Sequence, residues 1–259
     1  MDLGIRGKRA LVCASSKGLG RGSAKALAEA GVDLVLNARG AEALEATAQA
    51  IRDRYNVQVT AVAADITDPD GRARVLDAAG DLDILVTNAG GPPPGVWSDW
   101  GREDFLAAIE ANMLTPIALM SAVMPGMAER GWGRVVNITS QSVKAPIAAL
   151  GLSNSARAGL TGYVAGTARQ VAPSGVIVNN LLPGAHDTDR IEALDSAAAQ
   201  KQGKTRDEIR AAKFQTIPAR RYGTAAEFGA MCAFLCSQHA GYIVGQNILL
   251  DGGGINATL

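Results

Sequence analysis

The stretch ALVCASSKGLG, residues Ala10–Gly20, decides the fold. Its apolar start predicts a buried strand, its small residues predict a turn, and a helical pattern begins at Leu19. A strand, a glycine-rich turn and a helix are the parts that hold a pyrophosphate in nucleotide-binding sheets. Gly18 and Gly20 lack a Cβ, so backbone N–H groups can approach phosphate oxygens closely. The amino end of the helix adds unpaired N–H groups and a positive dipole end, and we therefore expect this turn to bind phosphate.

The rest of the chain repeats the alternation of strand and helix. Six further apolar runs read as strands, at residues 32–36, 57–63, 83–87, 134–138, 176–182 and 247–250. Strands that alternate with helices form a parallel sheet covered on both faces. We therefore predict an α/β fold, a doubly wound and mostly parallel seven-stranded sheet with helices on both faces, as a single domain over residues 1–259.

Helix boundaries are marked by capping residues and prolines. Gly31 stands where a helix would end, and Asp68 with Pro69 would begin another. A long helix is expected over 103–129, interrupted near Asn112 and again near Pro125. The other predicted helices cover residues 19–30, 41–55, 152–171 and the segment after Thr224, which forms a capping box with Glu227.

The segment 185–218 breaks the alternation. It is polar, it contains a capping box formed by Thr205 and Glu208, and it shows no strand pattern. Excursions of this kind at the carboxyl edge of a sheet are usually binding loops or lids. We expect a substrate lid here.

Charge and composition exclude several classes of partner. The net charge is zero and no basic run exists, so neither nucleic acid nor an anionic membrane is an expected partner. No apolar run is expected to reach the length of a membrane span, and residues 1–9 lack a signal sequence core. Cys13, Cys232 and Cys236 have no metal-ligand spacing, so we expect buried, reduced thiols in a cytoplasmic protein without a metal site.

The predicted strand ends carry polar or special residues. In a doubly wound sheet, ligands bind beyond the carboxyl ends of the strands, near the point where strand order reverses. The residues expected at that edge are Ser15–Gly20, Arg39, Asp65, Asn88–Gly91, Ser140 and Pro183–Thr188.

The end of the second strand indicates which dinucleotide binds. An acidic residue there would hold the adenosine ribose 2′-hydroxyl, but the chain has Asn37, Ala38 and Arg39, with Lys17 in the glycine turn. Two cations without a carboxylate favour NADP(H) over NAD(H), because they can bind the 2′-phosphate. Asp65 is expected either to hydrogen-bond the adenine edge or to cap a turn.

The motifs together resemble the short-chain dehydrogenase/reductase family over nearly the whole chain. CASSKGLG stands where that family has a TGxxxGxG turn, and NAG at Asn88–Gly90, NITS at Asn137–Ser140 and PG at Pro183–Gly184 follow in family order. The chain looks most similar to 3-oxoacyl-acyl-carrier-protein reductase-like members, so the expected sheet is of the Rossmann type.

The resemblance implies a set of cofactor-binding residues. Asn88–Gly90 would support the adenosine half, and Pro183 and Thr188 would flank the nicotinamide. It also implies a homodimer or homotetramer, with the last strand at the interface. The full expected set is Ala14, Ser15, Ser16, Lys17, Gly18, Leu19, Gly20, Arg39, Asp65, Ile66, Asn88, Ala89, Gly90, Arg157, Pro183, Gly184 and Thr188.

The catalytic positions depart from the family pattern of Asn, Ser, and a Tyr followed four residues later by Lys. Asn112 and Ser140 match, but Ser153 stands at the Tyr position and Arg157 at the Lys position. A serine hydroxyl is shorter and much less acidic than a phenol. Arg157 can still hold ribose hydroxyls, but a guanidinium does not release a proton in a relay. Ser153 is thus either a weak acid or a plain helix cap.

Two other residues could replace the missing acid. His186 follows Pro-Gly at the nicotinamide edge and titrates near neutral pH, and Lys144 lies in the loop after Ser140. Each could instead be an ordinary exposed loop residue. Ser140 can hydrogen-bond a carbonyl oxygen whichever group supplies the proton, and Asn112 can hold a water or simply interrupt its helix. On this reading, His186→Ala should lower turnover far more than Ser153→Ala.

The sequence therefore predicts an NADP(H)-dependent oxidoreductase with a non-standard proton donor. It would reduce a carbonyl, a 3-oxoacyl group or a similar ketone, or oxidise the matching alcohol, and its partner would be that small molecule. Two alternatives stay open: a non-redox enzyme such as a lyase or isomerase, and a regulatory member that binds cofactor without turnover.

Overall fold

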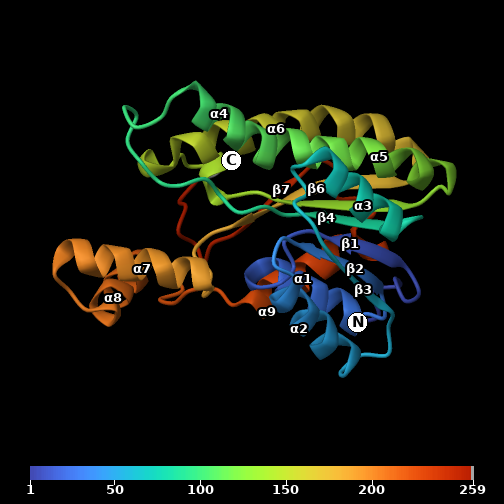
Figure 1. Ribbon diagram of the computed structural model, residues 1–259, viewed down its shortest axis with the longest axis horizontal. Helices are drawn as coiled ribbons and strands as arrows, with labels where there is room; N and C mark the ends of the chain where they lie inside the picture. The colour runs from blue at the N-terminus through green and yellow to red at the C-terminus, as the bar shows by residue number, and fades with distance from the viewer. Residues whose placement is uncertain (258–259) are drawn as a thin grey trace.

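Seven parallel strands form one sheet in the computed structural model, which describes residues 1–257 (Figure 1). Their order across the sheet is β3-β2-β1-β4-β5-β6-β7. The predicted doubly wound α/β sheet is confirmed, and every neighbouring pair of strands is parallel. The strands are β1 (Arg9–Val12), β2 (Asp33–Ala38), β3 (Val59–Ala63), β4 (Ile84–Thr87), β5 (Gly133–Ile138), β6 (Val176–Pro183) and β7 (Asn247–Leu250).

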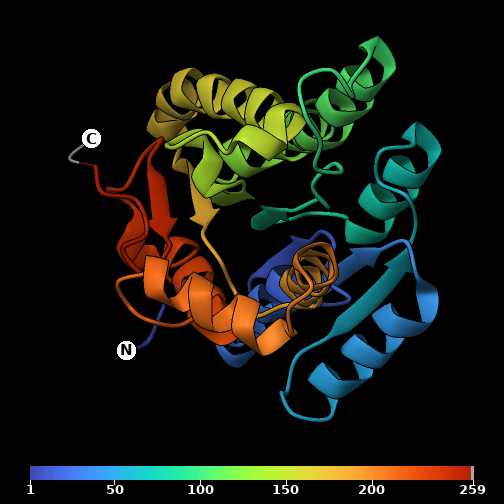
Figure 2. The same ribbon diagram turned by 90° about the vertical axis from the view of Figure 1, so that its left-hand side faces the viewer.

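Helices cover both faces of the sheet (Figures 1 and 2). One hydrophobic core joins the sheet to α1, α2 and α9, and a second joins the opposite face to α3, α5 and α6. The two cores explain why the strands are apolar on both sides. The helices are α1 (Gly18–Glu29), α2 (Ala41–Arg52), α3 (Pro69–Ala79), α4 (Arg102–Ile109), α5 (Thr115–Glu129), α6 (Gly151–Val171), α7 (Asp189–Gln202), α8 (Arg206–Thr216) and α9 (Ala225–Leu235).

The predicted helix caps are present. The Asp68 carboxylate accepts a hydrogen bond from the Gly71 N–H at 2.8 Å, with Pro69 as the first residue of α3. Thr205 with Glu208 begins α8, and Thr224 with Glu227 begins α9, each as a capping box. These local hydrogen bonds satisfy N–H groups that the helix leaves unpaired.

The long helix over 102–129 is interrupted once. A π-helical segment, Glu110–Leu114, separates α4 from α5, so the expected interruption near Asn112 is confirmed. The expected interruption near Pro125 is wrong, because α5 continues through it to Glu129. Buried Met120, Met124 and Met127 pack α5 against the sheet, and this tertiary packing outweighs the hydrogen bond that proline removes.

The same stretch, Arg102–Glu129, is long and apolar enough to cross a membrane by length and composition alone. Its most apolar window has a mean hydropathy of 1.5, so the expectation that no segment would reach this threshold is wrong. The stretch packs on β4, β5 and α6, and length and composition alone do not distinguish such a helix from a membrane span.

The strand order reverses between β1 and β4, which places a crevice at their carboxyl ends. The segment expected to form a lid contains α7 and α8, which project away from the sheet (Figure 1). Both the crevice and these two helices lie at the same edge, where β6 ends at Pro183.

Candidate functional site

A cavity of about 1010 Å³ opens at the carboxyl edge of the sheet. Its lining combines the glycine-rich turn, the ends of β4, β5 and β6, the start of α6 and the inner side of α7 and α8. The predicted site residues that it brings together are Ala14, Lys17, Gly18, Leu19, Asn88, Ala89, Gly90, Ser140, Ser153, Arg157, Pro183, Gly184, His186 and Thr188.

The glycine-rich turn has the backbone geometry of a phosphate cradle. Gly18 adopts φ +57°, and Ala14 adopts φ +46°, a region that glycine occupies far more readily than alanine. A Cβ on Gly20 would lie 2.3 Å from the carbonyl oxygen of Ala14, so this position accepts glycine alone. The residues present therefore fit a dinucleotide pyrophosphate, held by backbone N–H groups at the amino end of α1.

The two serines of the turn are used inside the protein. The hydroxyl of buried Ser15 donates to the Asn37 carbonyl at 3.3 Å, and the Ser16 carbonyl accepts from the Thr47 hydroxyl at 2.9 Å. Neither residue lines the cavity, and neither does Gly20, whose place is behind the turn. Ser15 and Ser16 thus fasten the turn to β2 and α2 rather than contact a ligand with their side chains.

Three charged residues were predicted to lie near the adenosine end of the cofactor: Lys17, Arg39 and Asp65. Arg39 is exposed just after β2, and Lys17 is exposed on the turn with its Nζ 3.7 Å from Asp189. Asp65 accepts hydrogen bonds from the Thr67 hydroxyl and N–H, which together with the nearby Arg39 charge lower the pKa of its carboxyl. Asp65 therefore caps a turn, which is one of its two expected roles.

Ile66 and the adjacent loop lie outside the cavity lining. The Ile66 carbonyl accepts a hydrogen bond from the Arg72 guanidinium at 3.1 Å, so its backbone is fixed by α3. Asp65, Ile66 and Arg39 do not line the cavity, and their contacts with an adenosine stay a prediction.

A chain of side-chain amides, which sequence reading missed, joins four neighbouring strands. The Thr87 hydroxyl donates to Asn137 at 2.7 Å, Asn137 donates to Asn180 at 3.2 Å, and Asn180 donates to Asn247 at 2.8 Å. The sequence feature that could have predicted this chain is the presence of an asparagine in each of three otherwise apolar strands. The buried chain fixes the register of the strands, and so positions the loops that carry Ser140 and Pro183.

Ser140, Ser153 and Arg157 line one part of the cavity, close to the ends of β4 and β5. The Ser140 hydroxyl accepts from the Ser142 N–H at 3.1 Å, and the Ser153 hydroxyl accepts from the Arg157 Nε at 3.2 Å. Each hydroxyl oxygen is thus an acceptor within the protein, and each keeps its own proton available for a ligand oxygen. Ser153 lies in the first turn of α6 but caps no backbone N–H; Leu150 is the N-cap.

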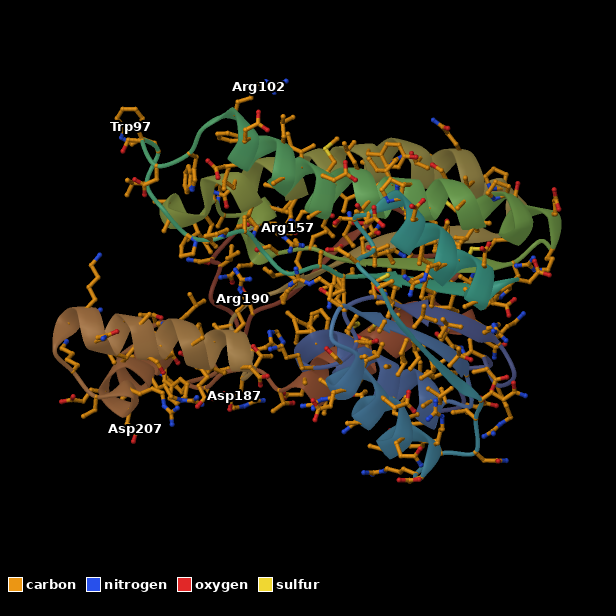
Figure 3. All side chains as sticks on the ribbon, viewed as in Figure 1. Trp97, Arg102, Arg157, Asp187, Arg190 and Asp207 are labelled. Atoms are coloured by element: carbon orange, nitrogen blue, oxygen red, sulfur yellow. The ribbon has the colours of Figure 1, made fainter. Side chains whose placement is uncertain are left out.

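Arg157 reaches from α6 down to the sheet edge (Figure 3). Its guanidinium donates to the Ile138 carbonyl at 3.0 Å and to the Ala89 carbonyl at 3.3 Å, so it ties β5 to the Asn88–Gly90 loop. The side chain is buried and has no carboxylate partner among residues 1–257. Burial, and then the positive charge of Arg190, lower the pKa of Arg157 to about 10.

Asn112 lies in the π-helical segment and is buried beside α6, outside the cavity lining. Its Nδ2 donates to the Ala108 carbonyl at 3.4 Å, while its Oδ1 has no donor among the described residues. A buried amide oxygen without a donor is suited to accept from a water, as expected. Asn112 therefore does not reach the cavity surface, and its binding of a water stays a prediction.

His186 is buried, so the expectation of an exposed loop histidine is wrong. Its Nδ1 lies 3.2 Å from the Gly184 carbonyl, which can only accept, so the ring proton sits on Nδ1. The ring packs edge-on against Phe228 at 5.2 Å, and burial lowers the pKa of His186. A neutral imidazole whose proton is engaged by a backbone carbonyl is a poor donor to a substrate, which weighs against its proposed role as the acid.

Lys144 is exposed at the end of a short 3-10 helix, Gln141–Val143, and does not line the cavity. The structure thus separates it from Ser140. Pro183, Gly184 and Thr188 do line the cavity, and Thr188 caps α7 by accepting from the Ile191 N–H.

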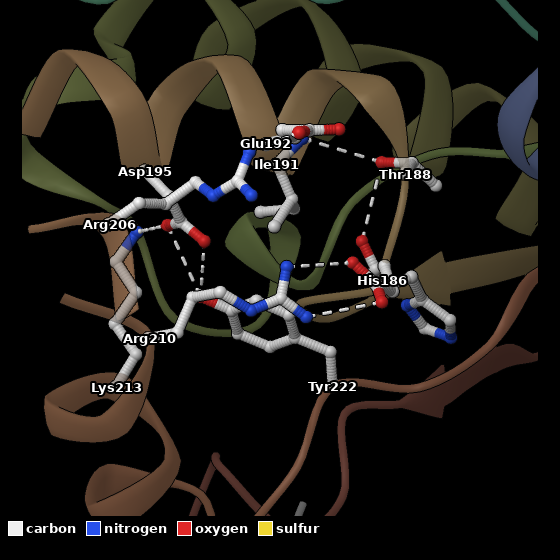
Figure 4. Close-up of polar contacts among 10 residues, drawn as sticks. His186, Thr188, Ile191, Glu192, Asp195, Arg206, Arg210, Lys213 and Tyr222 are labelled. Atoms are coloured by element: carbon white, nitrogen blue, oxygen red, sulfur yellow. Dashed lines mark hydrogen bonds and ion pairs between the residues drawn. The ribbon is translucent and has the colours of Figure 1, made fainter. Parts of the chain in front are cut away.

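Helices α7 and α8, in the segment predicted to form a lid, are joined by a buried carboxylate (Figure 4). Asp195 of α7 is fully buried, accepts from the Tyr222 hydroxyl at 3.0 Å, and pairs with Lys213 of α8 at 2.6 Å. Burial and then the Asp195 hydrogen bond raise the pKa of Tyr222, whose phenol proton is directed at Asp195. Arg210 and Asp187 add a second ion pair, at 3.1 Å.

Comparisons with known proteins agree with this geometry. The sequence profile of a family described as enoyl-(acyl carrier protein) reductase matches residues 13–254. The 3-oxoacyl-acyl-carrier-protein reductase FabG of Vibrio cholerae is 34% identical over 97% of this chain and 98% of its own. The acetoacetyl-CoA reductase of Cupriavidus necator is 34% identical over 70% of this chain and 69% of its own.

A solved structure also matches over the whole chain. L-Sorbose reductase from Gluconobacter frateurii, complexed with NADPH and L-sorbose, superposes with a TM-score of 0.95 at 27% identity. The match covers 99% of this chain and 100% of that one.

Proposed function

The chain belongs to the short-chain dehydrogenase/reductase family, and we propose that it reduces a ketone to an alcohol with NADPH. The reverse direction would oxidise the matching alcohol. The observation that carries the proposal is that one cavity joins the glycine-rich turn to Ser140, Ser153 and Arg157. A dinucleotide and a carbonyl group can therefore meet in one cavity.

Several features support NADP(H) as the cofactor. Relatives and structural neighbours of the chain are NADPH-dependent or NADP-bound reductases. The glycine-rich turn would hold the pyrophosphate, Arg39 and Lys17 would hold the adenosine phosphate, and Arg157 would contact the ribose beside the reacting ring. When bound, the cofactor supplies the hydride.

The side chains of the protein act on the carbonyl oxygen of the substrate. Ser140 and Ser153 each keep a hydroxyl proton available, and both can donate to the carbonyl oxygen as it gains negative charge. The buried Arg157 charge stabilises that oxygen, because few waters screen it there. The final proton comes from solvent through the Ser153 hydroxyl, which the Arg157 Nε–H orients.

The test is NADPH consumption with a panel of ketones and 3-oxoacyl thioesters. Ser140→Ala should lower kcat roughly 100-fold, as loss of one donor to a developing oxyanion does, and leave NADPH binding unchanged. NADPH binding without turnover on any substrate would favour the regulatory alternative. No binding of NADPH would remove the proposed function.

We also propose a homodimer or homotetramer in the cytoplasm. The α4–α5 stretch is apolar but only a third of its most apolar window is buried, and Phe105, Leu106 and Leu114 are exposed on it. A second copy would cover this surface. Sedimentation at several concentrations tests this, and a monomer at micromolar concentration would overturn it.

A further inference from the structure

The cavity holds a charge imbalance, of which the proposed reaction uses the Arg157 charge and leaves the Arg190 charge without a role. Six residues that carry formal charge line it: Lys17, Arg157, Asp189, Arg190, Lys213 and Asp251. Lys17 pairs with Asp189 at 3.7 Å, and Lys213 pairs with Asp195 at 2.6 Å. The Asp251 carboxylate accepts from the Gly253 and Ile255 N–H groups. Arg157 and Arg190 remain without an acidic partner in the described chain.

These two arginines bind the same loop: the Arg157 guanidinium donates to the Ala89 carbonyl, and the Arg190 guanidinium donates to the Gly91 carbonyl two residues later. Arg157 comes from α6, and Arg190 comes from the first turn of α7, where its guanidinium donates to the Gly91 carbonyl at 3.0 Å (Figure 3). Arg190 is close enough that its charge lowers the pKa of Arg157. Two like charges at one site destabilise each other, and the cost is greater because Arg157 is 94% buried, with 6% of its surface exposed.

The partners of Arg157 leave part of its donor capacity unused. A guanidinium has five N–H donors, and three of its hydrogen bonds go to Ser153, Ile138 and Ala89, all of them neutral groups. An anionic ligand group at the pair would satisfy the remaining donors and neutralise the repulsion. Carboxylates fit this geometry well, because guanidinium groups bind them through two parallel hydrogen bonds.

We propose that Arg157 and Arg190 bind a carboxylate of the substrate, so that the ketone reduced by this protein is a free oxo acid. This inference rests on the proposed reductase function and names the substrate class. The remaining lining near the pair includes apolar residues of the lid and of the loop before α6, which would hold the carbon chain; examples are Ile147, Leu150, Ile191 and Leu194.

A phosphate of the cofactor is the other source of an anion at this edge. Arg190 follows Thr188 at the start of α7, near the glycine-rich turn, where a pyrophosphate is expected. A cofactor phosphate and a substrate carboxylate predict different changes in activity when Arg190 is substituted. A cofactor contact affects every substrate equally, whereas a substrate contact affects a charged substrate and spares its neutral ester.

The experiment compares acids with their methyl esters. The probes are 2-oxobutanoate, 3-oxobutanoate and 4-oxopentanoate, each with its methyl ester, at saturating NADPH. The wild-type protein should favour at least one acid over its ester in kcat/KM. In Arg190→Met that preference should fall about tenfold, the effect expected from one charge-assisted hydrogen bond. Arg206→Met, a matched lid variant whose side chain pairs with Glu192 outside the cavity, should keep the preference.

Three results separate this inference from the function on which it rests. Esters reduced as well as acids by the wild-type protein would overturn the carboxylate site and leave the reductase function intact. Equal losses for acid and ester in Arg190→Met, with weaker NADPH binding, would assign the arginine pair to the cofactor and also overturn it. Calorimetric binding of an acid but not its ester to the NADPH-loaded protein, without turnover, would support the site and remove the reductase function.

Discussion

The two ends of the cavity depend on different parts of the chain: one on backbone groups and the other on side chains. At the cofactor end, recognition depends on the backbone: Gly18 adopts a positive φ, and Gly20 lies too close to the Ala14 carbonyl for any side chain. At the catalytic end, the proposed chemistry depends on side chains, and the resemblance of the sequence to its family predicts a tyrosine and a lysine where the chain has Ser153 and Arg157. A backbone cradle permits little change in sequence, whereas a set of side chains can be replaced as a unit.

The largest expected effect is a loss of NADPH binding, caused by a substitution that displaces the glycine-rich turn at the cofactor end. Gly20→Val would place side-chain atoms against the Ala14 carbonyl, which a Cβ already approaches to 2.3 Å, and the turn must then move. We expect at least roughly 100-fold weaker NADPH binding, since a shifted turn loses several backbone donors. Fluorescence titration with NADPH measures this.

The matched control is Gly162→Ala in α6, where no atom lies within 4 Å of an added Cβ. It should bind NADPH as the wild type does and be more stable by about 0.5–1 kcal/mol. Unaltered NADPH binding by Gly20→Val would show that the turn is not the phosphate site.

The next largest expected effect is on kcat, and it compares the two candidate proton donors at the catalytic end, Ser153 and His186. Ser153→Ala removes a hydroxyl that lines the cavity and accepts from Arg157, and should lower kcat about tenfold, as loss of one hydrogen bond does. His186→Gln should change kcat less, because the His186 proton is directed at Gly184. This reverses the ranking that the sequence suggests. A larger loss in His186→Gln, with the fold intact by circular dichroism, would return His186 to the mechanism.

A smaller effect concerns strain in the turn itself. Ala14 adopts φ +46°, which costs an alanine about 1 kcal/mol relative to glycine. Ala14→Gly should therefore raise the free energy of unfolding, by somewhat less than this cost because glycine is more flexible when unfolded. Urea denaturation measures the change. A loss of stability would mean that the Ala14 methyl group contributes packing that outweighs the strain.

The smallest effect is on the pH dependence of stability. Burial holds the pKa of His186 below its ordinary value, so the unfolded state binds the proton more tightly than the folded state. The resulting stability is present above the unfolded pKa of about 6.5 and is lost as pH falls from there through the lower folded pKa. His186→Gln should flatten this part of the stability curve in thermal melts. An unchanged curve would show that His186 is not buried as neutral imidazole.

Sequence patterns predicted the fold because each element carries its own signal. The strand, turn and helix at Ala10–Gly20, the capping boxes and the apolar strands all depend on residues close together in the chain. The interruption at Asn112 was also predictable, since an asparagine and its flanking residues break the helical pattern. Pro125 was misjudged because packing of α5 on the sheet decides whether the helix continues.

The catalytic end was harder to predict because its properties depend on distant contacts. Nothing near His186 in sequence indicates that Phe228 and Gly223 bury its ring. Arg190 was not a candidate at all, because its position beside Arg157 follows from the placement of α7 over the Asn88–Gly91 loop. The amide chain from Thr87 to Asn247 likewise needs the strand register.

The most direct test is a single-turnover reaction of the NADPH-loaded protein with ketones, comparing the wild type with Ser140→Ala. The account predicts that NADPH is oxidised by the wild type and that the variant binds NADPH equally well but oxidises it roughly 100-fold more slowly. If the wild-type protein binds NADPH but does not oxidise it when any ketone, thioester or oxo acid is added, the claim that this cavity reduces a carbonyl group with NADPH is contradicted.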